Sequence, residues 1–368
     1  MSTPWYTIDN IDKIDSPSLV IYPERIKENI RQLILMAEDV ARIRPHVKTN
    51  KIAEVCKLMQ NAGIQKFKCA TIAEAEMLAE IDAQDVLLAH QPVGPKADRL
   101  LELVHHFSDT VFSCVIDNLT TASILSELFS SNNYTLPVFI DLNIGMNRSG
   151  IKPEAALELY KKTKNLPGIR VIGLHAYDGH IRDTDLTERN RRSDEAFAKV
   201  EWLVKEIAAI DDTHLQIVIG GSPSFPTHTK RKNVVYSPGT FVFWDWGYKH
   251  IVPDEPFEYA ALVITRIISV IDEHTVCTDL GHKSVAAENP LPRVHFLNAP
   301  DANPISQSEE HLVLKVPDSS QYTVGDVLYG VPVHICPTVA LYDHAMVIEK
   351  HQKTTCWRVI ARSRKITI

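Results

Sequence analysis

The feature that most constrains the fold is an alternation of short apolar stretches with longer amphipathic stretches, from residue 17 to about residue 250. The short stretches are rich in Val, Ile and Leu and predict buried parallel strands, and the longer ones have helical periodicity. Eight barrel strands favour a closed (β/α)8 barrel of the TIM type over the alternative, an open doubly wound sheet. The open sheet is disfavoured because no GxGxxG sequence follows an early strand. The predicted strands are 43–48, 66–71, 85–90, 110–116, 136–142, 170–177, 214–220 and 233–237, and the predicted helices are 24–40, 50–62, 72–81, 95–106, 119–131, 153–164 and 187–209.

After Pro253 the pattern changes, and short β-type stretches replace the helices. We therefore expect two domains: an α/β barrel over 23–251 and a mainly-β domain over 252–368. The apolar strand at 17–22, within the N-terminal segment 1–22, is expected to join the second domain because chain ends often meet. The predicted strands of the second domain are 257–272, 275–280, 311–316, 327–335, 344–349 and 355–362.

Charge and cysteine content exclude several classes of protein. A formal net charge of −7 argues against a nucleic-acid-binding protein, which would normally carry a basic face. No apolar run approaches the length of a membrane span, and the first residues lack the pattern of a secretory signal. The six cysteines are scattered without a CxxC pair, which is typical of reduced thiols. We expect a cytoplasmic protein whose partner is a small molecule rather than nucleic acid or a membrane.

Lys48 ends the first predicted barrel strand. The carboxyl ends of barrel strands face one mouth, where such barrels carry out their chemistry. An amine in a partly desolvated pocket can form an imine with a carbonyl cofactor. The alternative for Lys48 alone is a surface lysine at a strand end.

Glycine turns follow the seventh and eighth predicted strands, where barrels often bind phosphate through backbone N–H groups. The first turn offers Gly221 and Ser222, and the second offers Gly239 and Thr240. Each could be an ordinary tight turn, but their pairing opposite Lys48 favours a phosphate cradle. A lysine and a phosphate cradle across one barrel predict pyridoxal phosphate.

Other polar side chains at the predicted strand ends complete this hypothesis. Tyr177 is placed to cover the cofactor ring, and Arg148 is a candidate cation for the phenolic oxygen. Arg148 could instead form a structural clamp with Asp141. Gln91 and His180 are candidate substrate contacts, with a structural loop histidine as the alternative for His180.

His334 and Cys336 form a second candidate site in the β domain. On a strand, these two residues point to the same face, and imidazole with thiolate suits zinc or a related divalent ion. Two ligands leave positions for water or a substrate hydroxyl. The alternative is a buried histidine and a core cysteine.

Six motifs taken together resemble the D-threonine aldolase and D-serine dehydratase family of fold-type III pyridoxal phosphate enzymes: RPHVKT, DLNIGMNRSG, GLHAYDGH, IGGSPS, SPGT and VHICPT. The resemblance covers essentially the whole chain and implies an alanine-racemase-like architecture and a homodimer. It implies that Lys48 carries pyridoxal 5′-phosphate and that His334 and Cys336 bind a divalent metal (Zn, Mn or Mg). The other cofactor-binding residues that it implies are Arg148, Tyr177, Gly221, Ser222, Gly239 and Thr240.

The resemblance implies a lyase of D-3-hydroxy amino acids, with Lys48, His334 and Cys336 as catalytic residues. Aldol cleavage to glycine and an aldehyde is the favoured reaction, and β-elimination by a D-serine or D-threonine dehydratase is the alternative. Cys336 is more similar to the dehydratases, because many D-threonine aldolases carry Asp at this position, and Asn50 replaces a histidine common in the family. Racemisation is disfavoured because Ser237 stands where alanine racemases have arginine. A non-catalytic pyridoxal-phosphate-binding protein is disfavoured by the β domain.

Overall fold

The computed structural model describes residues 3–368 and divides the chain into two compact units. The first, which we call the barrel unit, comprises Leu33–Lys48, Cys56–Gly239 and Ser363–Ile368. The second, the β unit, comprises the chain up to Gln32, Thr49–Val55 and Thr240–Arg362. No helix among the described residues has both the length and the apolar character needed to cross a membrane.

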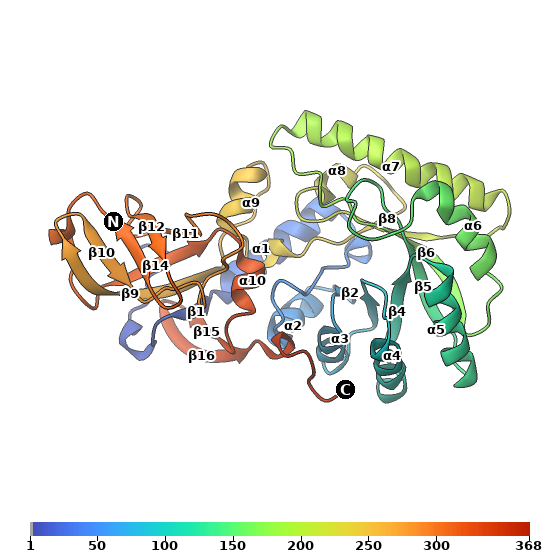
Figure 1. The fold of residues 1–368 in the computed structure, drawn as a ribbon, viewed down its shortest axis with the longest axis horizontal. Helices are drawn as coiled ribbons and strands as arrows, with labels where there is room; N and C mark the ends of the chain where they lie inside the picture. The colour runs from blue at the N-terminus through green and yellow to red at the C-terminus, as the bar shows by residue number, and fades with distance from the viewer. Residues whose placement is uncertain (1–2) are drawn as a thin grey trace. The chain divides into compact units, whose positions relative to one another are not determined.

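The barrel unit is built on a seven-stranded parallel sheet in which sequential strands are neighbours. Helices lie along the outer side of this sheet, as α4 to α7 show in Figure 1. The predicted strands from 66–71 to 233–237 and the predicted helices are confirmed, with differences of a few residues at their ends. The strands are β2 (Lys66–Cys69), β3 (Asp85–Leu88), β4 (Val111–Ile116), β5 (Leu136–Asp141), β6 (Ile169–Ala176), β7 (Gln216–Ile219) and β8 (Val234–Tyr236). The helices are α1 (Pro23–Ala37), α2 (Ala53–Asn61), α3 (Ile72–Ala79), α4 (Pro95–His106), α5 (Leu119–Ser131), α6 (Pro153–Thr163), α7 (Leu186–Ala208) and the short α8 (Phe225–His228); α1 and α2 contribute residues to both units.

The first predicted barrel strand, 43–48, is not a regular strand. Instead, Ile43 forms a parallel bridge with Tyr236 of β8, and His46 forms one with Lys68 of β2. Pro45 explains the interruption, because proline has no N–H to donate to a ladder. The segment still joins the two edge strands, since Arg44 N–H donates to Tyr236 and Val47 N–H donates to Lys68. The expectation of a closed barrel is therefore met by seven strands and one bridging segment.

Local sequence signals start several of the barrel helices. The side chains of Thr71, Asn118 and Asp185 accept backbone N–H bonds at the first turns of α3, α5 and α7. Pro95 and Pro153 begin α4 and α6, where a missing N–H costs nothing. Because every strand runs in the same direction, the loops from strands to helices all leave from one end of the barrel.

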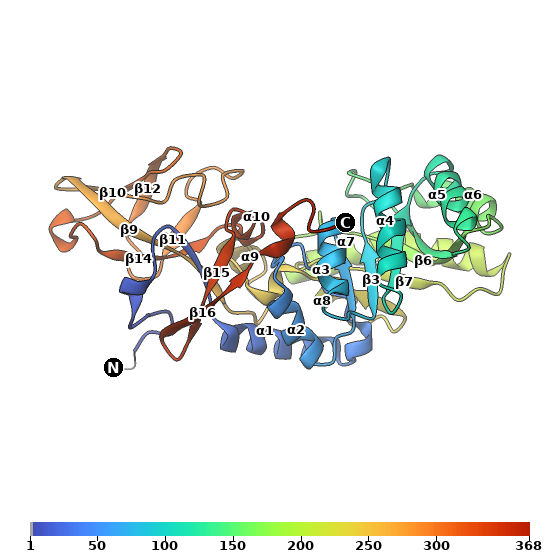
Figure 2. The same cartoon turned by 90° about the horizontal axis from the view of Figure 1, so that it is seen from below.

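The β unit contains a nine-stranded sheet, part of which is seen from another side in Figure 2. The N-terminal strand β1 (Ser18–Ile21) lies between β9, to which it is antiparallel, and β15, to which it is parallel. Strands β11 and β12 were not predicted. The other strands are β9 (Ala261–Asp272), β10 (Thr275–Thr278), β11 (Val294–Phe296), β12 (Asn303–Gln307), β13 (Leu312–Lys315), β14 (Val327–Pro332), β15 (His344–Glu349) and β16 (Gln352–Arg358), with two short helices, α9 (Trp246–Ile251) and α10 (Ile335–Val339).

Candidate active site

Tyr177, which directly follows β6, has three cationic groups around its ring. The centroid of the ring lies 5.9 Å from Lys48 Nζ, 5.5 Å from Lys68 Nζ and 5.0 Å from Arg148 Cζ. Lys68 is buried, Lys48 is partly exposed and Arg148 is exposed. The barrel therefore brings together the predicted residues Lys48, Tyr177 and Arg148, and adds a cation that the sequence reasoning missed.

Lys68 belongs to a buried chain of polar groups. Its Nζ lies 3.4 Å from His175 Nε2, and His175 Nδ1 lies 2.7 Å from Asp141 Oδ1. Asp141 also accepts a hydrogen bond from Ser149, so Asp141 bonds to these residues rather than forming the alternative clamp with Arg148. Burial, together with the charge of Lys48, lowers the pKa of Lys68 to about 7. Sequence reasoning could have noticed Lys68 as a cation between two apolar residues, Phe67 and Cys69, of one strand.

The glycine turn after β7 packs against Tyr177. A Cβ added to Gly221 would lie 3.0 Å from Cε2 of Tyr177, so only glycine allows the ring this close an approach. The turn after β8 meets the same turn, because Gly239 N–H donates to Ser222 Oγ over 3.3 Å. The structure thus joins the two predicted turns directly, and a bound phosphate would exchange this long hydrogen bond for bonds to its own oxygens.

A second buried network holds the turn after β7 in place. Gly221 N–H donates to Ser224 Oγ, and Ser224 Oγ donates to Asp178 Oδ1 over 2.6 Å. The other oxygen of Asp178 lies 2.7 Å from His228 Nε2, and both of these side chains are fully buried. Asp178 is therefore committed to positioning the turn next to Tyr177.

The charges around Tyr177 fit an anionic ligand. Lys48, Lys68 and Arg148 converge there, whereas Asp178 is paired with His228 and Asp141 with His175. Uncompensated cations in a partly buried site repel one another, so a ligand with several negative charges would relieve the repulsion. Pyridoxal phosphate has a phosphate, a phenolic oxygen and an aldehyde for Lys48, and it therefore fits this set of residues.

In the β unit, His334 and Cys336 lie at the junction between β14 and α10. His334 is the N-cap of α10 and Cys336 is in its first turn, so the prediction that both stand on a strand is wrong. Pro337 gives the reason, because its fixed φ and missing N–H suit the first turn of a helix. The two side chains nevertheless remain hydrogen-bonded to each other.

The thiol of Cys336 has polar neighbours on other segments of the β unit. Thr49 Oγ1 lies 3.1 Å from its Sγ, and Thr240 Oγ1 lies 3.5 Å from it. Burial raises the pKa of the Cys336 thiol, but the hydrogen bond with His334 and its charge lower it by more, for a net decrease. Burial lowers the pKa of His334, but Cys336 and Glu288 together raise it to about 9. The site thus favours the thiolate form, which is the form that binds metal.

These side chains fit a divalent metal as a partial ligand set. Glu288 Oε1 lies 2.5 Å from His334 Nδ1, so a metal bound by this ring would use Nε2, in the manner of carboxylate–histidine–metal arrangements. Within residues 3–368 there is no group of three or more His, Cys, Asp or Glu side chains that could hold a metal ion. Two protein ligands would leave the remaining positions to solvent or substrate.

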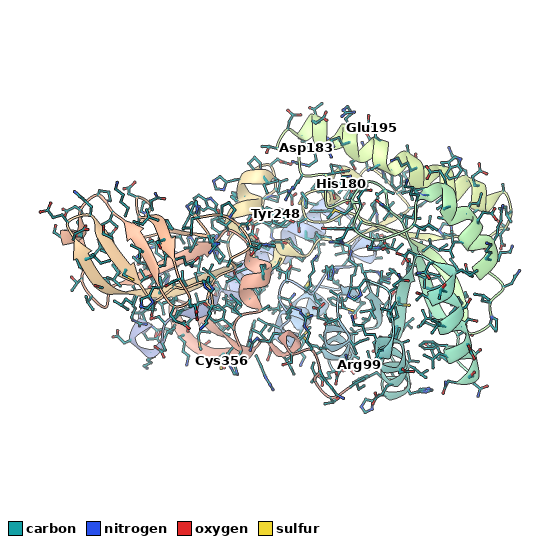
Figure 3. The ribbon with its side chains drawn as sticks, in the orientation of Figure 1. Arg99, His180, Asp183, Glu195, Tyr248 and Cys356 are labelled. Atoms are coloured by element: carbon teal, nitrogen blue, oxygen red, sulfur yellow. The ribbon has the colours of Figure 1, made fainter. Side chains whose placement is uncertain are left out.

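The two candidate substrate residues have structural partners. Gln91 Nε2 donates to Asp117 over 2.6 Å, and Asn118 donates to Gln91 Oε1, so Gln91 ties the ends of β3 and β4 together. Gln91 also lines a cavity of about 220 Å³ that reaches Asp141. His180, labelled in Figure 3, packs against Gly145, where an added Cβ would lie 2.6 Å from its Nε2.

A larger cavity, about 650 Å³, lies between α7 and the amino-terminal ends of β7 and β8. None of the residues predicted for the site line it. The chemistry-bearing side chains instead gather at the opposite, carboxyl-terminal ends of the strands, where barrels place their active sites.

Two family models match the chain. The model described as "Alanine racemase, N-terminal domain" matches residues 21–244, which is more than half of the chain. The model described as "Putative serine dehydratase domain" matches residues 260–348. Together the two matches extend over both the barrel strands and most of the β strands.

The chain is similar along most of its length to characterised aldolases. It is 27% identical over 367 residues to the D-threonine aldolase of an Arthrobacter species, covering 96% of this chain and 94% of that protein. It is 28% identical over 367 residues to the 3-hydroxy-D-aspartate aldolase of Paracoccus denitrificans strain Pd 1222, covering 96% and 93%. The crystal structure of D-threonine aldolase from Filomicrobium marinum superimposes with a TM-score of 0.89 at 25% identity, covering 98% of this chain and 99% of that one.

Proposed function

Because the chain belongs to the family of the alanine racemase N-terminal domain, we propose that it is a pyridoxal-phosphate- and divalent-metal-dependent lyase of D-3-hydroxy amino acids. The reaction that we favour is retro-aldol cleavage of D-threonine or a related substrate to glycine and an aldehyde. The observation that carries the proposal is the convergence of Lys48, Lys68 and Arg148 on Tyr177 at the mouth of the barrel.

In this proposal, residues 23–251 form the cofactor-binding domain. Lys48 is the residue that carries pyridoxal phosphate, Tyr177 packs against the cofactor ring and Arg148 contacts its phenolic oxygen. The cofactor, when bound, supplies the electron sink for breaking a bond at Cα. Lys48 Nζ also accepts or returns a proton at Cα of the substrate, a task suited to an amine in a partly desolvated site. The phosphate is held by the two turns, through Gly221, Ser222, Gly239 and Thr240.

Residues 252–368, with the N-terminal strand, form the domain that carries the metal ligands, His334 and Cys336. A divalent ion there supplies charge that lowers the pKa of a bound β-hydroxyl group. Glu288 orients the imidazole, and Thr49 holds the Cys336 sulfur. Lys48 and Thr49 are consecutive in the sequence, as are Gly239 and Thr240, so the peptide chain links each predicted cofactor contact to a neighbour of the metal ligands. Gln91 and His180 remain candidate substrate contacts.

The choice of aldol cleavage depends on the relatives. Two aldolases resemble the chain over more than nine tenths of its length, and this similarity favours aldol cleavage. In aldol cleavage the β-hydroxyl group of the substrate loses its proton as the Cα–Cβ bond breaks. A dehydratase is the second candidate, because Cys336 and the serine dehydratase domain match both favour it. In that reaction Lys48 removes the α-proton and the β-hydroxyl leaves.

One incubation separates these reactions. Purified protein is mixed with pyridoxal phosphate, a divalent metal and D-threonine, and the products are analysed by chromatography. Glycine with acetaldehyde is expected, whereas ammonia with 2-oxobutanoate would identify the dehydratase. Neither product pair from D-threonine, together with formation of L-alanine in a parallel incubation with D-alanine, would instead support a racemase. A protein that binds the cofactor but is inert to all D-amino acids and insensitive to chelators would be a non-catalytic binding protein.

We also propose that the protein is a cytoplasmic homodimer, as the resemblance implies. Its mass in solution, measured by light scattering after size exclusion, tests the assembly.

A further inference from the structure

Lys68 is a buried cation whose position needs an explanation. It is 2% exposed and lies on β2 between Phe67 and Cys69, both of which are completely buried. Lysine is almost never buried to this degree unless it has a partner that offsets the loss of hydration. Lys68 is not one of the residues that the proposed lyase reaction uses, so its role is a separate question.

The side chain of Lys68 is held by a defined hydrogen-bond chain. The carboxylate of Asp141 accepts from the ring of His175 at Nδ1, with 2.7 Å between the two atoms. With its proton on Nδ1, the neutral ring has a lone pair on Nε2, which accepts from Lys68 Nζ at 3.4 Å. Burial lowers the pKa of His175 and thus favours this neutral form. Asp141 and His175 therefore position the amine of Lys68 beside Tyr177.

The charges that face Lys68 leave it short of negative partners. Lys48 and Arg44 repel its charged form, and Asp141 and Asp178 favour that form. Neither carboxylate is within hydrogen-bonding distance of Nζ, because Asp141 binds His175 and Asp178 binds His228. Desolvation outweighs the carboxylates, and the pKa of Lys68 falls to about 7. A bound anion close to Nζ would complete the coordination of this amine and restore its charge.

The order of the strands indicates which anion this is. The glycine turns for the phosphate follow β7 and β8, Lys48 follows the bridging segment next to β8, and Lys68 is on β2 at the other side of that segment. In pyridoxal phosphate, the carbon that carries the aldehyde lies between the carbon with the phosphate arm and the carbon with the phenolic oxygen. When the phosphate is at β7 and β8 and the aldehyde is at Lys48, the phenolic oxygen falls toward β2.

We propose that Lys68 is a second cationic contact, beside Arg148, for the phenolic oxygen of the cofactor, and that the Asp141–His175 pair positions it. This inference rests on the proposed function, since it requires pyridoxal phosphate to be the ligand. It assigns Lys68 a binding role that is distinct from the covalent role of Lys48. An ammonium ion and a phenolate form a charge-assisted hydrogen bond, which is stronger than one between neutral groups.

The test compares two ligands that differ only in the phenolic oxygen: pyridoxal 5′-phosphate and 3-deoxypyridoxal 5′-phosphate. Dissociation constants are measured by quenching of tryptophan fluorescence in the wild type and in Lys68→Met, Lys68→Arg and the control Lys66→Met. Lys66 is on the same strand, and its amine donates to the carbonyl oxygen of Ala41. We expect Lys68→Met to weaken binding of pyridoxal phosphate roughly 10- to 100-fold, the range for a hydrogen bond to a charged group.

The same substitution should change the affinity for the 3-deoxy ligand by less than about threefold, since the partner of Lys68 is missing there. Lys68→Arg should regain part of the loss, and Lys66→Met should bind both ligands as the wild type does. Equal weakening of both ligands by Lys68→Met would show a merely structural role and overturn the inference. Wild-type protein that binds neither ligand would instead contradict the proposed function.

If circular dichroism shows that the Lys68→Met protein does not fold, a second variant tests the same inference. His175→Asn keeps Lys68 but removes the ring that positions it. We expect His175→Asn to weaken the binding of pyridoxal phosphate more than the binding of the 3-deoxy ligand, by a factor of at least about 5. The reason is that it displaces Lys68 from the phenolic oxygen. An equal effect on the two ligands would overturn the inference by this route.

Discussion

Lys68 Nζ lies 3.4 Å from His175 Nε2, and both side chains are buried where the strands of the barrel end. The contact with His175 places the amine of Lys68, on β2, beside the bridging segment that ends at Lys48. Two amines and a guanidinium at one tyrosine ring explain why this site would bind a multiply charged anion better than a neutral ligand.

Replacing Lys48 by alanine should remove the covalent attachment of the cofactor. We expect Lys48→Ala to show no borohydride-reducible adduct with pyridoxal phosphate and to lose lyase activity to background, because Lys68 is held by His175 and cannot take its place. Mass spectrometry after reduction measures the adduct. Lys57→Ala, an exposed residue of α2, serves as control and should retain both the adduct and activity. A full adduct in Lys48→Ala would refute the site assignment.

Glu288→Gln should weaken metal binding without removing a ligand. The carboxylate fixes the orientation of the His334 ring and increases the basicity of its nitrogen, and loss of such a group typically costs about 10- to 100-fold in metal affinity. Competition with a chromophoric chelator measures the affinity for zinc. Glu310→Gln, which changes an exposed carboxylate paired with Lys283, should leave the affinity unchanged. An unaltered affinity in Glu288→Gln would show that Glu288 does not support a metal-binding His334 ring.

The stability of the cofactor-free protein should depend on pH through Lys68. Its pKa is about 7 in the folded state, against an ordinary value of 10.5. Between these values the unfolded chain binds more protons, so the contribution of Lys68 to the free energy of unfolding rises with pH. Below about pH 7 Lys68 is protonated in the folded as well as in the unfolded state, so the full cost of burying its charge lowers the free energy of unfolding. Urea unfolding from pH 7 to 10 should therefore show that the stability of Lys68→Met relative to the wild type decreases as pH rises. A constant difference would contradict the shifted pKa.

Asp178→Asn should destabilise the barrel through the loss of a buried, charge-assisted hydrogen bond. Asp178 and His228 are fully buried, with 2.7 Å between Oδ2 and Nε2, and loss of such a bond costs about 1.5–3 kcal/mol of unfolding free energy. Glu158→Gln disrupts the exposed contact with Lys161 and should cost much less, because exposed ion pairs contribute little to stability. Urea unfolding measures both variants. Similar losses in the two would show that the Asp178 network does not stabilise the turn after β7.

Local patterns in the sequence determined most of the elements of the fold. Runs rich in Val, Ile and Leu identified β3 to β8, because strands buried on both faces are apolar over most of their length. Capping residues such as Asn118 and Asp185 marked helix starts, since a short polar side chain satisfies N–H groups that the helix leaves open. The short strands β11 and β12 were missed because they have few residues and no clear alternation.

The tertiary structure decided how distant side chains combine. Sequence reasoning identified Lys48, Tyr177 and Arg148 one strand end at a time, but it overlooked Lys68, since the fate of a lysine within a strand depends on which face the barrel encloses. The contact of Lys68 with His175 joins residues 107 positions apart, and the contact of His334 with Glu288 joins residues 46 positions apart. Spacing in a sequence fixes which groups share a local face. Only the closed barrel fixes how deeply Lys68 is buried and how far it lies from other charges, and burial first, then the charge of Lys48, lowers its pKa.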